Sequence, residues 1–291
     1  MHEIVRNHSF AVSSLLHRLD RPDEIADMLS DLYPGTPGIN LVPPWPSTEH
    51  ASQASKMRDV ALDRGLPAAM LITQAKSGSI SVAQVLSHGF HLPAVVYALS
   101  VGRVIAPWAL DLSRGGGSYV THLNPTPKNV ALLAASGIRH VMVHVRDPRG
   151  QLLSLLHHFS KYGTGNPAEE AKWQRMSFDE KFEMLAADAL PLQVEWIRGW
   201  LGAREALNVS FTTYEQFARN PEAFVDLLVA RYGGDTRFFD RDAALGRRAE
   251  IDYHFRKGKA DSWKDELNAT QIQRINAAIP GGFWREFGWT P

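Results

Sequence analysis

A loop of small and basic residues directly follows the first buried-strand pattern in the sequence. Ala69–Thr73 is a short apolar run, and residues 74–79 after it read Gln-Ala-Lys-Ser-Gly-Ser. A helix is expected next, and the unpaired N–H groups and dipole at the start of a helix favour an anion. Lys76 adds a positive charge, and Ser77 and Ser79 add hydroxyl donors. These residue types in this order could hold a phosphate or sulfate group.

A second interpretation of this loop stays open. Ser77 or Ser79 could act only as the N-cap of the following helix. A Walker A loop is excluded, because that motif needs Gly-Lys followed by Ser or Thr, whereas Lys76 comes before Gly78.

A second candidate segment follows the clearest strand pattern, His140–Val145. Arg146 comes at the carboxyl end of this strand, where its fork-like guanidinium suits a phosphate. Asp147-Pro148 is typical of an N-cap followed by proline at the first helical position. Ser154 lies two turns into that helix and can face the same ligand if the helix runs beside it. The alternatives are a salt bridge for Arg146 and ordinary helix packing for Ser154.

The third candidate is a histidine at the end of the β-prone run Tyr119–Leu123, which stops at Asn124-Pro125. An imidazole can accept a proton near neutral pH, so His122 is a candidate general base. The chain has 12 histidines, and most of them are expected to be structural or exposed. Position favours His122, because the other histidines of this region lie within a strand or a helix: His140, His144, His157 and His158.

The elements between these segments alternate between strand and helix. One further strand is expected at Asn208–Thr212, and helices at about 53–64, 79–87, 127–136, 148–162, 177–201, 214–218 and 221–232. This alternation predicts an α/β fold with a central, mostly parallel sheet flanked by helices. Ligands of such sheets bind at the carboxyl ends of the strands. Residues 1–65 are expected to form an N-terminal helical extension with a Pro-rich loop, and residues 66–291 the α/β domain.

Composition limits the classes of protein that fit. The 291 residues include 31 Lys plus Arg and 31 Asp plus Glu, so the formal net charge is zero. A general polyanion binder carries a basic excess, so no nucleic-acid partner is expected and any anion site is local. The absence of cysteine excludes disulfides, thiolate metal sites and a cysteine nucleophile. No secretory signal and no run of about 18 apolar residues is present, which predicts a cytoplasmic protein without membrane insertion.

Taken together, the candidate segments resemble the sulfotransferase superfamily. Lys76–Ser79 is similar to the family's Lys-Ser-Gly-Thr loop, Thr121–Leu123 to its Thr-His-Leu, and Arg146–Arg149 with Ser154 to its 3′-phosphate segment. Later segments that resemble the family are Thr213–Glu215 before Asn220-Pro221-Glu222, Phe255–Gly258 before Trp263-Lys264, and the terminal residues 283–289. The resemblance covers residues 69 to about 289.

This resemblance implies the sulfotransferase fold, which is related to that of P-loop nucleotide kinases. It implies in-line transfer of a sulfuryl group from 3′-phosphoadenosine-5′-phosphosulfate (PAPS) to a hydroxyl or amine, with PAP as product and no metal. His122 would be the general base, and Lys76 would stabilise the bridging oxygen. The other residues that the resemblance places at the nucleotide are Ser77, Gly78, Ser79 and Ile80 at the 5′ end, Tyr214 at the adenine, and Arg146, Ser154, Arg256, Lys257 and Gly258 at the 3′-phosphate.

The sequence departs from the cytosolic phenol- and steroid-sulfating branch at several positions. Ile80 replaces a second threonine, Ser81 replaces the tryptophan that stacks on adenine, and Val120 replaces a lysine. Asn268-Ala269 replace the Thr-Val of that branch's dimer motif, so whether the chain forms a homo-oligomer is left open.

The acceptor is expected to be a small molecule, namely a natural product, a sugar or a lipid alcohol. Residues 103–118 should border its pocket, with Gly115–Gly117 as the hinge of a lid. Two other functions stay open. A small-molecule kinase would need a Gly-Lys-Ser/Thr loop and a carboxylate for Mg²⁺, and a non-catalytic module that binds PAPS or PAP could lose His122.

Overall fold

The computed structural model describes residues 48–92, 94–95, 104, 106–138, 140–164, 167–232, 236–246 and 259–291. The expected helices of residues 1–35, most of the Pro-rich loop, and Arg256, Lys257 and Gly258 lie outside the described residues. The division of the chain at residue 65 therefore stays a prediction.

The described strands form one sheet in which every paired neighbour is parallel. The strands are β1 (Ala69–Thr73), β2 (Ala94–Val95), β3 (Ser118–Thr121), β4 (Val141–Val145) and β5 (Val209–Thr213). Their order is β2-β3-β1-β4-β5, so β1 and β4 are central. Both central strands are buried along their whole length, as their short apolar runs predict.

Helices follow or precede nearly every strand. They are α3 (Thr48–Asp63), α4 (Ser79–Gly89), α5 (Ala106–Ser113), α6 (Pro127–Ala135), α7 (Pro148–Tyr162), α8 (Pro167–Arg175), α9 (Phe178–Gly202), α10 (Arg204–Leu207), α11 (Tyr214–Arg219), α12 (Pro221–Tyr232), α13 (Arg241–Gly246), α14 (Ala269–Ala278) and α15 (Gly281–Phe287). Two short 3₁₀ helices, Thr236–Phe238 and Ser262–Asp265, complete the described elements. The helices expected between residues 53 and 232 are confirmed, and α5, α8, α10 and α13 to α15 were not predicted.

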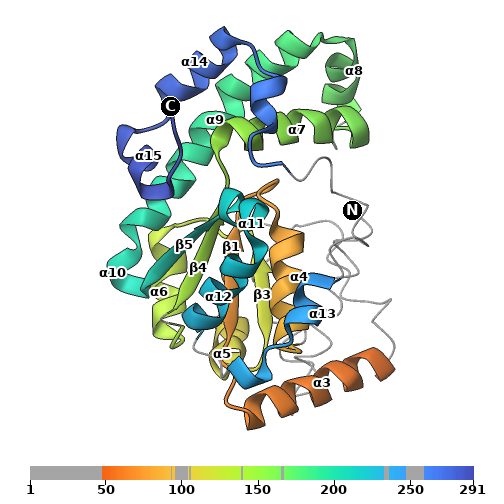
Figure 1. Cartoon of the computed structure of the whole chain (residues 1–291), viewed down its shortest axis with the longest axis vertical. Helices are drawn as coiled ribbons and strands as arrows, with labels where there is room; N and C mark the ends of the chain where they lie inside the picture. Colours follow the sequence, from red (N-terminus) through yellow and green to blue (C-terminus); the bar gives the residue numbers. More distant parts are fainter. Residues whose placement is uncertain are drawn as a thin grey trace.

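Alternate residues of the central strands point into two separate hydrophobic cores. Met70 and Ile72 of β1 pack with α6, α7, α9 and α14, whereas Ala69 and Leu71 pack with α3, α4 and α12. Because side chains of a strand alternate between its two faces, the sheet is covered on both sides. The predicted α/β architecture with flanking helices is therefore confirmed (Figure 1).

The carboxyl ends of the strands share one edge of the sheet, as they must in a parallel arrangement. In Figure 1 this edge faces α7 and α11, while α3 lies at the opposite end of the molecule. The helix α7 begins as the sequence predicts: the Asp147 side chain accepts from the N–H of Arg149 at 2.9 Å, and Pro148 is the first helical residue. This cap fixes where the chain leaves β4 and turns into α7.

The glycines before β3 are not a lid hinge, and this expectation was wrong. Gly115, Gly116 and Gly117 are all buried. The carbonyl of Gly115 accepts from Arg58 Nε at 3.1 Å, and Gly116 N donates to the Leu66 carbonyl at 2.9 Å. Residues that precede a parallel strand lie at its amino end, so these glycines anchor α3 at the edge opposite the carboxyl ends.

Candidate functional site

The loop between β1 and α4 has the backbone shape of an anion nest. Lys76 and Gly78 both take left-handed conformations, with φ of 66° and 89°. A Cβ on Gly78 would lie 2.9 Å from Cδ2 of Tyr214, which is closer than real contacts allow. Glycine is therefore required at position 78 both for its φ and for the close approach of the Tyr214 ring.

Three consecutive carbonyls of this loop accept hydrogen bonds from side chains of β4, α7 and the turn between them. The Ala75 carbonyl accepts from Gln151 at 2.8 Å, and the next two carbonyls accept from Arg146 at 3.1 Å and His144 at 3.0 Å. The C=O and N–H of a trans peptide point in opposite directions. Holding the carbonyls on one side turns the amides of Lys76 and Gly78 to the other side, where they can bind an anion, whereas the Ser77 N–H donates to the Gln74 carbonyl at 3.3 Å.

Lys76 extends from this loop toward α7. Its Nζ lies 3.3 Å from Nδ1 of His158. Burial of the ammonium and the nearby Arg146 guanidinium lower the pKa of Lys76. The sequence places Lys76 and Arg146 seventy residues apart, and the structure brings their charges to one place, which an anionic ligand would neutralise.

The side chains of residues 77–80 differ in what they present to this space. Ser77 is fully buried, and its hydroxyl donates to the Gln74 carbonyl at 2.7 Å, so the hydroxyl closes the loop. Ser79 is the first residue of α4 and is partly exposed. Ile80 is 43% exposed, and its side chain carries no donor for an anion.

His122 lies just past the end of β3, next to the end of β1. Its Nδ1 is 2.8 Å from the Thr73 carbonyl and 3.0 Å from the Thr73 hydroxyl. A carbonyl oxygen only accepts, so Nδ1 carries the hydrogen in the neutral ring and Nε2 keeps its lone pair. The exposed imidazole therefore presents a basic nitrogen beside the strand that leads into the anion loop.

Arg146 lies at the carboxyl end of β4, as expected, and is held from two sides. Its guanidinium packs over the ring of Tyr214 at 4.1 Å. A Cβ on Gly150 would lie 3.1 Å from Arg146 Nε, so α7 also passes close by.

One face of α7 runs between the two basic residues. Gly150, Ser154 and His158 are four residues apart, and residues at this spacing share one face of a helix. Gly150 lies against Arg146, and His158 contacts Lys76. The partly exposed Ser154 therefore lies on the face that connects the two basic residues, as the sequence required for it to meet the same ligand.

The sequence interpretation missed His144, which was set aside as a histidine within a strand. His144 is fully buried, and its Nδ1 and Nε2 lie 2.9 Å from the Thr212 hydroxyl and 3.0 Å from the Ser77 carbonyl. Burial lowers the pKa of His144 to about 3, so the ring is neutral. A polar residue in an otherwise apolar central strand is the signal that could have identified it, because buried polar groups need partners.

A buried polar cluster supports the turn between β4 and α7 from below. Both oxygens of Glu215 accept hydrogen bonds, from the Asp147 backbone at 3.2 Å and from Trp289 Nε1 at 3.0 Å. Burial, and then the nearby Asp147 carboxylate, raise the pKa of Glu215 to about 7. Asp147 itself is paired with Arg149 at 2.6 Å.

The segment after the undescribed residues 247–258 returns to this turn. Trp263 packs over the guanidinium of Arg149 at 4.0 Å, and its Cδ1 would lie 3.5 Å from a Cβ on Gly150. The roles expected for Arg256, Lys257 and Gly258 stay predictions, but the chain that follows them is anchored against the start of α7.

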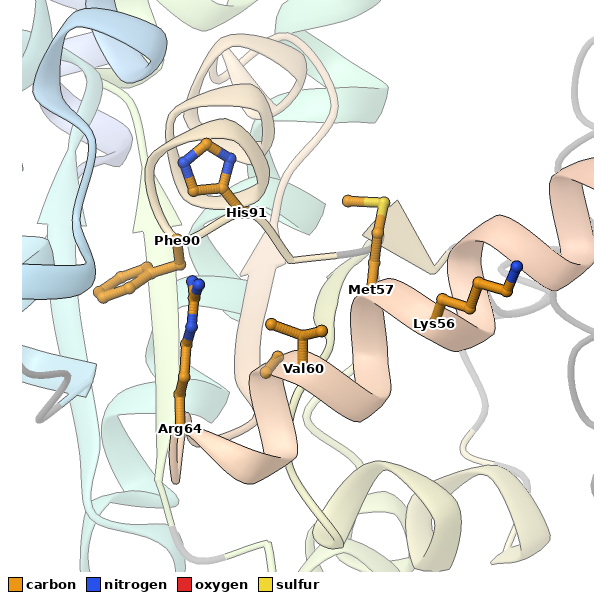
Figure 2. A pocket seen from close by; sticks show the side chains of 7 residues that line it. Lys56, Met57, Val60, Arg64, Phe90 and His91 are labelled. Carbon is orange, nitrogen blue, oxygen red and sulfur yellow. The ribbon is translucent and has the colours of Figure 1, made fainter.

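A cavity of about 330 Å³ lies elsewhere, between α3 and the end of α4. Its lining side chains are shown in Figure 2: Lys56, Met57, Val60, Ala61, Arg64, Phe90 and His91. Since α4 begins at the anion loop and runs back along the sheet, its end lies at the opposite edge. This cavity is therefore separate from the site at the carboxyl ends of the strands.

Metal sites and membrane-spanning helices can be assessed for the part of the chain that the structure describes. No group of three or more His, Asp or Glu side chains in it could hold a metal ion. No helix in it is long and apolar enough to cross a membrane.

Comparisons with known proteins support the fold. No family model matches the chain, and neither does any curated protein. The crystal structure of mouse sulfotransferase SULT7A1 complexed with PAP is similar, with a TM-score of 0.53 and 14% identity over 81% of this chain and 90% of that chain. Retinol dehydratase in complex with androsterone and inactive cofactor PAP gives a TM-score of 0.48 and 15% identity over 82% and 88%. The chain thus has the sulfotransferase fold that its sequence motifs predict.

Proposed function

We propose that this protein transfers a sulfuryl group from PAPS to a hydroxyl or amine of a small acceptor. The observation that carries the proposal is the position of His122: Thr73, at the end of β1, holds its Nδ1, and the same strand leads directly into the anion nest that contains Lys76. The similar mouse protein is a sulfotransferase complexed with PAP, which is adenosine 3′,5′-bisphosphate. A general base next to an anion cradle is the arrangement that group transfer to a hydroxyl needs.

The 5′-phosphosulfate is assigned to the loop after β1. The amides turned inward by the bonds to Gln151 and His144 supply donors, and the start of α4 adds its dipole. The residues assigned to the 5′-phosphosulfate are Lys76, Ser77, Gly78, Ser79 and Ile80. Gly78 and Ile80 contribute backbone N–H groups, and Ser79 can also contribute its hydroxyl. Ser77 shapes the loop, since its N–H and its hydroxyl both donate to the Gln74 carbonyl.

The 3′-phosphate is assigned to Arg146 and Ser154, with Arg256, Lys257 and Gly258 completing the site. A guanidinium packed on an aromatic ring is held in one orientation, which suits paired hydrogen bonds to a phosphate. Tyr214 touches both Gly78 and Arg146, so its ring lies between the two phosphate subsites. This position suits contact with the adenosine that joins them.

The transfer step then follows from the two catalytic groups. The acceptor hydroxyl gives its proton to Nε2 of His122 as its oxygen bonds to sulfur. The bond between sulfur and the bridging phosphate oxygen breaks, and the ammonium of Lys76 stabilises the charge that develops on that oxygen. A positioned donor of this kind contributes about 2.7–4 kcal/mol to the transition state. PAP and the sulfated acceptor are the products.

Titration calorimetry with PAP and with 5′-AMP tests the nucleotide assignment. Preference for PAP is expected, because only PAP carries the 3′-phosphate for Arg146 and Ser154. Equal or absent binding in a folded sample would contradict the proposal and favour an unrelated or kinase-like function. An acceptor screen with radiolabelled PAPS then tests transfer, and PAP binding without turnover on any natural product, sugar or lipid alcohol would favour a non-catalytic module.

A further inference from the structure

His144 occupies a position where an apolar side chain would be expected. It is the penultimate residue of β4, opposite Thr73 of β1 and Thr212 of β5. It shares the face of Met142, and its ring lies 5.8 Å from that of Phe224. Burying an imidazole among such groups costs free energy unless both ring nitrogens have partners. The polar group at this position therefore calls for a function that valine could not supply.

The hydrogen bonds of His144 run in one direction only. The Ser77 carbonyl can only accept, so Nε2 carries the hydrogen and donates to it at 3.0 Å. Nδ1 is then an acceptor, and it receives the hydroxyl hydrogen of Thr212 at 2.9 Å. Thr212 thereby satisfies Nδ1 and holds the ring with Nε2 aimed at the Ser77 carbonyl. The relay connects β5 through β4 to the backbone of the anion loop.

The carbonyl that His144 holds belongs to the peptide between Ser77 and Gly78. No cis peptide is present in the described chain, so the N–H of Gly78 points away from His144. Gly78 is also the N-cap residue of α4, where the backbone N–H groups face a bound anion. The orientation of this one peptide is thus set by a side chain behind the loop.

We propose that His144 is a positioning residue: it orients the Gly78 amide so that this amide can bind the 5′-phosphosulfate. His144 itself does not touch the nucleotide. This inference rests on the proposed function. Arg146 and Gln151 hold the two preceding carbonyls, but Arg146 is also assigned to the 3′-phosphate. His144 contacts the loop from the sheet side only, so its loss should affect the 5′ end selectively.

The test compares PAP with adenosine 3′-monophosphate, which lacks the 5′-phosphate, by calorimetry on His144→Leu and His144→Gln. His144→Leu should lower the preference for PAP over the 3′-monophosphate about tenfold, because one donor to the 5′-phosphate is lost. His144→Gln should keep most of that preference, since its Nε2 can reach the Ser77 carbonyl. A loss caused only by general destabilisation would weaken both ligands alike.

His140→Leu is the matched control. His140 immediately precedes the same strand, is exposed and hydrogen-bonds to Asn208 at the other edge of the sheet. It should leave the ratio of the two affinities unchanged.

Thr212→Val is a second, independent probe in case His144→Leu does not fold. At nearly constant volume, it removes the hydroxyl that donates to Nδ1 and holds the ring with Nε2 aimed at the Ser77 carbonyl. A several-fold lower preference for PAP is expected. A wild-type ratio in folded His144→Leu, or in Thr212→Val when the former is unfolded, would overturn the inference. If the wild-type protein itself binds both ligands equally, the proposed function fails instead.

Discussion

At the scale of single residues, the site depends on where hydrogens sit on two histidines. In His122 the Thr73 carbonyl places the hydrogen on Nδ1, which leaves a basic nitrogen exposed. In His144 the Ser77 carbonyl places it on Nε2, which makes that nitrogen a donor to the loop. The nitrogen that faces a carbonyl thus makes His122 a candidate base and makes His144 a donor that supports the anion loop. His144 lies within β4, and His122 lies just past the end of β3.

His122→Ala should lower the rate of sulfuryl transfer by about 10²–10⁴-fold, the usual contribution of a general base. The Kd for PAP should change less than about twofold, because the ring lies at the end of β3 and not in the anion loop. Turnover with the acceptor found by the screen, and calorimetry with PAP, measure the two effects. His140→Ala serves as the control. Undiminished turnover in His122→Ala would eliminate the general-base assignment.

Gly78→Ala should weaken PAP binding more than about tenfold and lower the free energy of unfolding by about 1–3 kcal/mol. The new Cβ would lie 2.9 Å from the Tyr214 ring at a φ of 89°. Gly202→Ala is the matched control, because nothing lies within 4 Å of its Cβ position. Urea unfolding and calorimetry measure both quantities, and wild-type affinity in Gly78→Ala would contradict the nest geometry.

At the scale of elements, the site is assembled where four strands end and helices begin. Helix α9 is fastened to this edge by two tryptophans: Trp196 and Trp200 both donate from Nε1 to the Leu123 carbonyl, at 2.9 and 3.2 Å. Gln74 donates to the Gln193 carbonyl of the same helix at 3.0 Å. Gln74, which follows β1, and Leu123, which follows His122 after β3, are therefore both held by α9.

The contact of α11 with the β4–α7 turn should make stability depend on pH. The folded pKa of Glu215 is about 7, above its ordinary value near 4.5. Between these values the folded protein keeps a proton that the unfolded chain has released, so the free energy of unfolding falls as pH rises. Glu215→Gln removes this contribution. The difference in the free energy of unfolding between the variant and wild type should therefore change by on the order of 1–3 kcal/mol between pH 5 and 8.

Urea titrations of both proteins across this range measure the difference. The amide introduced by Glu215→Gln has one acceptor oxygen, so it can accept only one of the two hydrogen bonds that the carboxyl group accepts. The variant should therefore be the less stable protein at pH 5 and should recover relative to wild type as pH rises. The exposed Glu205→Gln is the control and should follow the wild-type curve. A constant gap between Glu215→Gln and wild type would contradict the assigned titration.

At the scale of the whole molecule, one buried arginine joins segments that are far apart in the sequence. Arg149 pairs with Asp147 and donates to Asn276 at 3.2 Å and to the Thr290 carbonyl at 2.7 Å. Its guanidinium also packs over Trp263 at 4.0 Å. The last residues of the chain are thereby held to α7, which borders the proposed phosphate subsites.

Arg149→Met should lower the free energy of unfolding by about 3–5 kcal/mol, since it leaves the Asp147 carboxylate buried without its partner. The double variant Arg149→Met with Asp147→Asn should recover part of this loss, because the unpaired charge is gone. Urea unfolding measures both. An exposed pair, Arg241 with Glu222, is the comparison, and Arg241→Met should cost less than about 1 kcal/mol. Equal effects of Arg149→Met and Arg241→Met would contradict the role of burial.

Local signals were sufficient for much of the fold. The apolar runs of β1 and β4 and the Asp147-Pro148 start of α7 depend on neighbouring residues only, so their positions follow from the sequence. The alternation of strands and helices predicted the parallel α/β architecture, and the resemblance of the motifs, in their order, to those of sulfotransferases implied the particular fold. The helices α13 and α15 were missed, since six or seven residues carry little periodicity. For α14 a signal was present and unused, the capping box of Asn268 with Gln271.

The sequence by itself determined which loops could meet a nucleotide, because a strand followed by a Gly- and Ser-rich turn and a helix has a defined local geometry. Only the tertiary structure decided what each side chain does within them. Gly115–Gly117 proved to anchor α3, since parallel strands put their preceding residues at the far edge. His144 proved to support the anion loop, since its partners Ser77 and Thr212 lie 67 and 68 residues away. Hydrogen bonds over such separations follow from the strand order of the sheet, which no local pattern specifies.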